Sequence, residues 1–104
     1  MSDATHFAIW ATDRRDMAAE RARVREAHRA RLREGVPGAL KVVLGGPTTD
    51  EAGAMNGSLL VVEAHDLAAV RDFLAGDPYV LGGVYDTVEV RPWQWGLGRI
   101  GPGT

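Results

Sequence analysis

The distribution of apolar positions along the chain predicts four strands. Four short segments are dense in β-branched, leucine and aromatic side chains, which is typical of buried strands. They cover residues 6–11, 39–44, 58–63 and 84–91. Between the second and third segments, residues 48–57 are rich in Thr, Asp, Gly and Asn. This composition is typical of a loop, and we interpret it as a hairpin connection.

Two helices are predicted between these strands. Residues 17–34 are rich in Ala, Arg, Glu and Leu, which favour helices; two possible caps lie in residues 12–16, and Gly35 and Pro37 end the segment. The second helix begins after Asp66 and ends at Gly76. Its apolar side chains recur with helical spacing and form one stripe. The stripe comprises Leu67, Val70, Phe73 and Leu74.

The order of elements, βαββαβ, predicts an α+β fold of the ferredoxin-like, split-βαβ type. This arrangement is a four-stranded antiparallel sheet with both helices on one face. We expect residues 1–104 to form a single domain, with its core at about residues 6–92 and a tail at 93–104. No internal repeat or linker divides the chain.

The second face of such a sheet needs cover, which predicts a homodimer. Alternate residues in the second and fourth strands are apolar, and a monomer would expose them as a patch. They are Leu40, Val42, Leu44, Val84, Val88 and Val90. Trp93 and Trp95 follow the last strand. Two placements remain open for these indoles: against the chain's own sheet, or against a partner.

Composition excludes several classes of protein. The absence of cysteine excludes disulfides, thiolate metal centres and a thiol nucleophile. Residues 1–6 lack the basic start of a leader, and no apolar run is long enough to span a bilayer, so a cytoplasmic protein is expected with no membrane partner. Most arginines lie between Arg14 and Arg33, but acidic residues interleave them and the net charge is −2. This pattern favours a solvated helix over a nucleic-acid surface.

The predicted topology brings candidate site residues to one edge of the sheet. Gly45-Gly46, Ser58, Asp77 and the start of the first helix all reach that edge. On a helical wheel, His28 points inward on the side of Val24. A continuous helix places His28 at about mid-height, whereas a break near Arg25 brings it close to Asp77.

Each candidate residue has a structural and a functional interpretation. Asp77 precedes Pro78, as in a helix cap, and His28 is either a locally hydrogen-bonded histidine or an acid–base group. Ser58 either satisfies a turn or binds a substrate oxygen, and Arg25 either pairs with an acid or holds an anion. Tyr79 is either core or cavity wall. His6, His28 and His65 lack the spacing of metal ligands, so no metal is expected.

Several separated motifs together resemble the YCII-related family. They are Arg25-x-x-His28, Gly45-Gly46 with Gly57-Ser58, Asp77-Pro78-Tyr79, and the closing Val88-x-Val90-x-Pro92-Trp93. The resemblance covers roughly residues 6–95. It implies a dimeric α+β barrel type of assembly and a catalytic pair of His28 and Asp77. One departure is Glu26, where the family often carries Pro, which would encourage the break near Arg25.

From the residues and this resemblance we infer a cofactor-free acid–base enzyme. The pair His28 and Asp77 would act on a small polar or aromatic molecule by elimination or isomerisation, as in a dehydrochlorinase-like reaction known in the family. Ser58, Arg25 and Tyr79 would bind the substrate. One alternative is a non-catalytic ligand-binding or accessory module of the same fold. The other is a monooxygenase of the dimeric α+β barrel kind.

Overall fold

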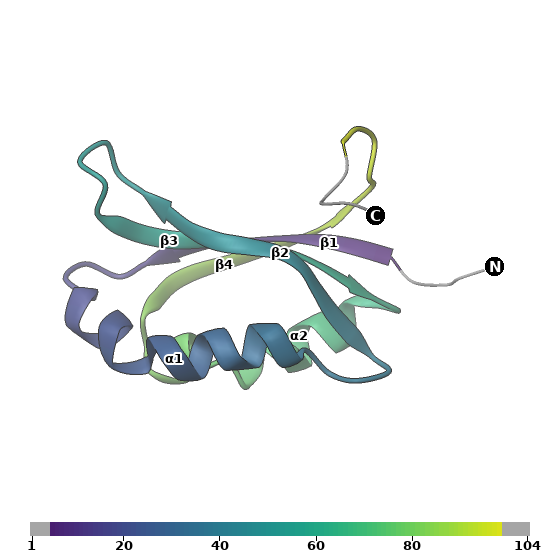
Figure 1. Ribbon diagram of the computed structural model, residues 1–104, viewed down its shortest axis with the longest axis horizontal. Helices are drawn as coiled ribbons and strands as arrows, with labels where there is room; N and C mark the ends of the chain where they lie inside the picture. The colour runs from purple at the N-terminus through teal and green to yellow at the C-terminus, as the bar shows by residue number, and fades with distance from the viewer. Residues whose placement is uncertain (1–4, 99–104) are drawn as a thin grey trace.

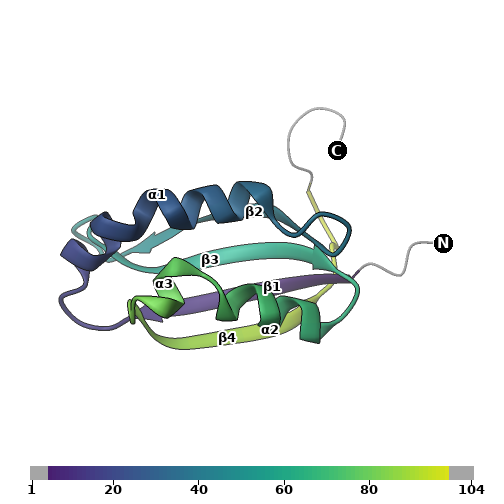
Figure 2. The same ribbon diagram turned by 90° about the horizontal axis from the view of Figure 1, so that it is seen from below.

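A computed structural model describes residues 5–98 as a sheet covered on one face by helices (Figure 1). Its strands are β1 (Thr5–Asp13), β2 (Leu40–Thr49), β3 (Met55–Ala64) and β4 (Tyr85–Trp93), all paired antiparallel in the order β2-β3-β1-β4. Its helices are α1 (Ala18–Glu34), α2 (Leu67–Ala75) and the short α3 (Pro78–Leu81). The predicted ferredoxin-like fold is confirmed. The same fold seen from below shows the three helices in front of the sheet (Figure 2).

The β2–β3 hairpin is longer than the sequence predicts. We expected a loop over residues 48–57, but both strands continue into this region and only residues 50–54 lie between them. The Asp50 carboxylate accepts hydrogen bonds from the backbone N–H groups of Ala52 and Ala54, which closes the turn. Because β2 is an edge strand, Pro47 interrupts no second ladder and the strand continues through it.

The helix ends confirm two predicted caps and correct a third. Asp66 caps α2 by accepting from Ala69 N–H, and Asp77 caps α3 by accepting from Tyr79 N–H, with Pro78 at the first helical position. Helix α1, by contrast, has no side-chain cap at Met17, so the caps expected in residues 12–16 do not form. Asp13 lies at the end of β1 instead.

The hydrophobic core lies between the sheet and α2. Side chains from β1, β2, β3 and α2 form one buried cluster, which comprises Phe7, Ile9, Leu40, Leu60, Val62, Ala64, Val70, Phe73 and Leu74. Helix α1 differs sharply, because its two buried residues are Arg21 and His28. Burying such groups is costly unless they are paired. The inner face of α1 therefore buries polar side chains, whereas the inner face of α2 buries hydrophobic ones.

The middle of the open face is apolar, and Leu44 is the one predicted residue that lies there. A bulge in β2 changes the register between Val42 and Leu44, so that Leu44 points to the open face while Leu40 and Val42 face the helices. In β4, Val88 and Val90 pair with helix-facing residues, and Val84 precedes the strand. We define the open-face patch as Ala8, Trp10, Leu44, Leu59 and Val61.

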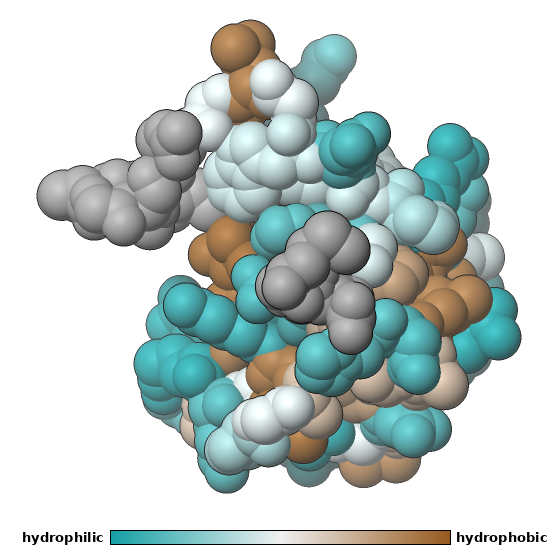
Figure 3. Space-filling model, turned by 90° about the vertical axis from the view of Figure 1, so that its right-hand side faces the viewer, coloured by the Kyte–Doolittle hydropathy of each residue, from teal (hydrophilic) through white to brown (hydrophobic). Residues whose placement is uncertain are grey.

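Two segments stand above the open face. The β2–β3 turn rises at one end and the segment after β4 rises at the other (Figure 1). Trp93 and Trp95 contact each other edge-to-face and both contact the ring of His6, so these indoles pack against their own chain. Viewed from this end, hydrophobic and hydrophilic side chains are intermixed on the surface (Figure 3). Residues 99–104 of the expected tail, like residues 1–4, lie outside the described residues.

Candidate functional site

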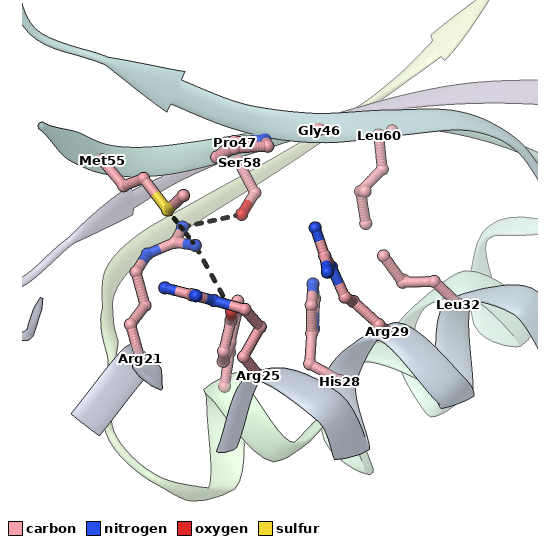
Figure 4. A pocket seen from close by; sticks show the side chains of 12 residues that line it. Arg21, Arg25, His28, Arg29, Leu32, Gly46, Pro47, Met55, Ser58 and Leu60 are labelled. Atoms are coloured by element: carbon pink, nitrogen blue, oxygen red, sulfur yellow. Dashed lines mark hydrogen bonds between the residues drawn. The ribbon is translucent and has the colours of Figure 1, made fainter. Parts of the chain in front are cut away.

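A small cavity lies between the inner face of α1 and the sheet (Figure 4). Its volume is about 150 Å³. Helix α1 supplies one wall, β2 and β3 supply the other, and α3 contributes one aromatic ring. The lining residues are Arg21, Arg25, His28, Arg29, Leu32, Gly45, Gly46, Pro47, Met55, Ser58, Leu60 and Tyr79.

His28 projects from the middle of α1 into this cavity and is held on two sides. Its Nδ1 lies 2.8 Å from Oδ1 of Asp77, and its ring stacks on Tyr79 with centroids 3.7 Å apart and planes 13° from parallel. An ionised carboxylate only accepts hydrogen bonds, so in the neutral ring Nδ1 carries the proton and Nε2 keeps its lone pair. The stack on Tyr79 fixes the ring plane. The arrangement therefore gives the cavity one well-oriented proton acceptor.

Asp77 is placed by the junction between α2 and α3. Gly76 ends α2, and Asp77 is fully buried where its Oδ1 also accepts from Tyr79 N–H at 2.8 Å. One oxygen thus serves both the helix cap and His28. Oδ2 has no hydrogen-bond partner among the described residues. A buried carboxylate in this position stabilises a positively charged imidazole better than a neutral one.

Arg21 organises the opposite end of the cavity. Its guanidinium pairs with both oxygens of Asp13, at 2.6 and 3.3 Å, in a buried ion pair. It also donates to Gly57 O at 2.6 Å and Ser58 Oγ at 3.0 Å. Burial alone would lower the pKa of Arg21, but the hydrogen bond and charge of Asp13 outweigh it and raise that pKa. Arg21 therefore remains cationic and is neutralised within the fold.

Ser58 receives two hydrogen bonds. Besides Arg21, the Tyr85 hydroxyl donates to Ser58 Oγ at 2.8 Å. Burial is the main cause that raises the pKa of Tyr85 well above its ordinary value. Tyr85 is therefore a neutral phenol at any physiological pH, and its hydroxyl donates a hydrogen bond to Ser58.

Two further arginines line the cavity with little or no acidic compensation. Arg25 makes no ion pair or hydrogen bond with any residue between 5 and 98, and its Nε is buried without a partner. The one acidic partner of Arg29 among the described residues is the exposed carboxylate of Glu26, at the long distance of 3.9 Å. Figure 4 shows both side chains, with His28, rising from α1 into the space beneath the strands. The cavity is therefore positively charged on its α1 side.

The structure brings the predicted site residues together without a helix break. His28, Ser58, Arg25 and Tyr79 line one cavity, and Asp77 lies directly behind His28. The sequence left open a continuous helix or a break near Arg25, and α1 is continuous through Glu26. Contact is possible because the α2–α3 junction lies beside the middle of α1 rather than beyond its end.

Sequence reasoning missed several residues of the site. Asp13, Arg21, Arg29, Met55 and Tyr85 were not singled out. The signal available for Arg21 and Arg29 was spacing, because Arg21, Arg25 and Arg29 recur every four residues and share the side of the helix that carries His28. No sequence signal places Tyr85 beside Ser58, since that contact depends on the β1–β4 register.

The part of the chain that the structure describes shows neither a metal site nor a membrane-spanning helix. Residues 5–98 contain no cluster of three or more His, Asp or Glu side chains able to hold a metal ion. Within the same range, no helix is long and apolar enough to cross a membrane.

Comparison with known proteins gives consistent matches over nearly the whole chain. The model of the YCII-related domain matches residues 5–94. Protein YciI of Escherichia coli O6:H1 is 34% identical over 98 residues, which cover 85% of this chain and 95% of that protein. An uncharacterized protein of Haemophilus influenzae is 33% identical over 96 residues, covering 86% and 96%.

Solved structures of similar shape include an enzyme with a bound small molecule. The 5-chloro-2-hydroxyhydroquinone dehydrochlorinase of Burkholderia phenoliruptrix, in complex with 2,5-dihydroxybenzoquinone, has a TM-score of 0.74 and 28% identity, covering 88% of this chain and 95% of that one. A dimeric ferredoxin-like protein of unknown function from Bacteroides fragilis has a TM-score of 0.57 and 13% identity, covering 90% and 98%. The second likeness concerns the fold alone.

Proposed function

The chain belongs to the YCII-related domain family, and from this premise we propose that it is a cofactor-free acid–base enzyme acting on a small polar or aromatic molecule. The observation that carries the proposal is the pairing of His28 with the buried Asp77 at 2.8 Å in the wall of a cavity. A histidine held by a carboxylate on one nitrogen, with the other nitrogen facing a cavity, is suited to proton transfer near neutral pH.

In the proposed reaction His28 is the base and Asp77 is its positioning partner. Nε2 accepts a proton from a hydroxyl or an acidic C–H of the substrate. As the electron pair of that bond moves into the substrate, a leaving group departs with its own bonding pair in an elimination, or the proton returns to another atom in an isomerisation. Asp77 stabilises the imidazolium through Nδ1, and Tyr79 keeps the ring plane fixed.

The dehydrochlorinase supports elimination as the first reaction to test. Its fold overlaps this chain at a TM-score of 0.74, and its substrate is a chlorinated hydroxyhydroquinone. A ring of this kind is of a size suited to a small cavity, well below the roughly 300–1,000 Å³ typical of sites for drug-sized ligands. We propose chemistry of the same type here, on a substrate that shares the acidic hydroxyl.

A non-catalytic ligand-binding module is the alternative that the same cavity supports. It keeps the arginines and Ser58 as binding groups but needs no proton transfer by His28. The two functions differ in what happens after binding: the enzyme releases an altered molecule, whereas the module releases the same one.

We also propose that the chain works as a homodimer. The open-face patch is apolar and lies on the face opposite the helices. The dimeric neighbour of the same fold is consistent with an assembly of this kind.

Turnover measurements on matched variants test the function. The protein is incubated with 5-chloro-2-hydroxyhydroquinone and with a panel of halogenated phenols, and chloride release is measured. We expect His28→Ala to lower turnover by about 10²-fold or more while the thermal melt stays close to that of the parent. The exposed His65→Ala serves as the control and should leave the rate unchanged. Well-folded His28→Ala protein that turns over as fast as the parent would eliminate His28 as the base.

A further inference from the structure

The hydrogen-bonding character of the cavity defines the class of molecule that fits it. Ser58 Oγ accepts from Arg21 at 3.0 Å and from Tyr85 at 2.8 Å. A hydroxyl has two acceptor sites and one donor, so both acceptor sites of Ser58 are occupied. Its own proton has no acceptor among the described residues. Ser58 is therefore limited to the role of donor toward a ligand.

The arginines add to this donor character. A guanidinium has five N–H donors and no acceptor. Arg21 is neutralised by Asp13, but Arg25 has no acidic partner among residues 5–98 and a buried Nε without an acceptor. Leaving such a donor unpaired is costly, about 1–3 kcal/mol for a buried polar group. An oxyanion beside Arg25 would satisfy both its charge and its geometry.

Two described polar side chains of the cavity can accept a hydrogen bond: the Tyr79 hydroxyl, which already accepts from Arg21 at 3.4 Å, and the His28 ring. With Nδ1 of His28 committed to Asp77, the bare Nε2 accepts a proton from the ligand. The site thus combines an anion-binding side, formed by Arg25 with Ser58, and a proton-accepting point at His28, beside which Arg29 projects (Figure 4). Asp77 contacts the histidine ring but is not among the residues that line the cavity.

We propose that the ligand is a small planar organic anion that presents one oxyanion to Arg25 and keeps one protonated hydroxyl for His28. The oxyanion is a carboxylate or an enolate, both of which offer Arg25 a negatively charged oxygen on a planar, delocalised group. This inference rests on the proposed function, because it names the substrate class of the same site. It also assigns Arg25 as the residue that discriminates charged from neutral ligands.

Calorimetry with paired probes tests the proposal. The probes are 4-hydroxybenzoate, its neutral counterpart 4-hydroxybenzamide, benzoate without the hydroxyl, and the enolic acid 2,5-dihydroxybenzoquinone at a pH at which its monoanion, with one hydroxyl, predominates. We expect at least one anion that keeps a hydroxyl to bind at least tenfold more tightly than the amide and than benzoate. Preference for 4-hydroxybenzoate identifies a carboxylate ligand, and preference for the quinone identifies an enolate.

Matched arginine variants locate the effect. Arg25→Gln should weaken binding of the preferred anion at least tenfold and remove the preference over the amide. Arg23→Gln removes the same charge from the same helix, but Arg23 is exposed and pairs with Glu20, so its effect should stay below twofold. The proposal is overturned if the amide binds as tightly as the anions, if no probe binds at millimolar concentration, or if the two variants weaken binding equally.

These outcomes are separable from those of the proposed function. Anion binding that depends on Arg25, without turnover of any substrate, would support this inference and count against the enzyme. Turnover of neutral substrates that is insensitive to Arg25→Gln would support the enzyme and count against this inference.

Discussion

Asp77 performs two tasks with a single oxygen atom. Oδ1 accepts the Tyr79 N–H as a helix cap and the His28 Nδ1–H as a positioning contact, both at 2.8 Å. Because the cap itself requires an acidic or small polar residue, the sequence Asp-Pro explains this residue without any function. The contact with His28 is what gives the cap a chemical role.

Replacing Asp77 should cost more stability than replacing an ordinary cap. Asp77→Ala removes the α3 cap and leaves the buried Nδ1–H of His28 without an acceptor, so we expect the free energy of unfolding to fall by about 2–4 kcal/mol. Asp66→Ala removes an exposed cap of α2 and should cost only about 1 kcal/mol. Urea denaturation of both variants measures the difference. Equal losses would show that the contact with His28 contributes nothing to stability.

Tyr85 predicts a loss of stability in alkaline solution. Burial raises the pKa of Tyr85 in the folded state above its ordinary value near 10. The protonated phenol therefore contributes stability that is fully present below about pH 10 and is lost as the pH rises through 10 toward the folded pKa, at up to about 1.4 kcal/mol per pH unit. In denaturation experiments between pH 9 and 11, the free energy of unfolding should fall less steeply with pH in Tyr85→Phe than in the parent. Parallel pH profiles for the parent and the variant would contradict the assignment.

Helix α1 is the element that turns the fold into a candidate site. Its inner face carries Arg21 and His28 where a simple ferredoxin-like helix would place apolar residues. The core is supplied by α2 instead, whose Val70, Phe73 and Leu74 pack on the sheet. Because α2 forms the core with the sheet, the space between α1 and the sheet is available for a polar cavity.

Sequence pattern predicted the elements well and their contacts less well. Periodicity located every strand and both long helices, because buried strands and the α2 stripe have strong local signals. The β2 bulge that turns Leu44 to the open face, and the extension of β2 through Pro47, depend on pairing with β3 and carry no local signal. The same holds for the site: the motifs name His28 and Asp77, whereas Arg21 and Tyr85 depend on contacts across the sheet.

The close approach of β1 and β3 makes Gly57 sensitive to substitution. A Cβ at Gly57 would clash with the carbonyl oxygen of Ala11 and lie 2.7 Å from Thr48 Oγ1. Because a backbone atom cannot yield as a side chain can, Gly57→Ala should lower stability by about 1–3 kcal/mol. Gly46→Ala, on the neighbouring strand, meets no atom within 4 Å and should cost well under 1 kcal/mol. Thermal melts that rank the two variants equally would exclude a close backbone approach at Gly57.

At the scale of the whole molecule, the two faces of the sheet have different roles. The helix-covered face holds the core and the cavity, and the open face carries the open-face patch between two raised segments (Figure 1). Trp10, its most exposed member, is 53% exposed. Contiguous apolar surface of this kind marks association in soluble proteins.

Light scattering at micromolar concentration should give about twice the chain mass of 11.2 kDa. Trp10→Lys places a charge in the open-face patch and should shift the protein to monomer. Leu81→Lys makes the same kind of change on α3, at a residue that is 73% exposed on the opposite layer, and should leave the dimer intact. A monomeric parent, or equal dissociation of both variants, would contradict the role of the patch.

The protonation state of His28 tests the central claim most directly, because it can be measured without a substrate. Two-bond ¹H–¹⁵N correlation spectra of the histidine rings report which nitrogen carries the proton, and His28→Ala assigns the signal among the three histidines. For neutral His28 we predict a protonated Nδ1, bound to Asp77, and a bare Nε2 facing the cavity. A neutral ring that is protonated on Nε2 would show that His28 has no free acceptor in the cavity, and the proposed role as base would be wrong.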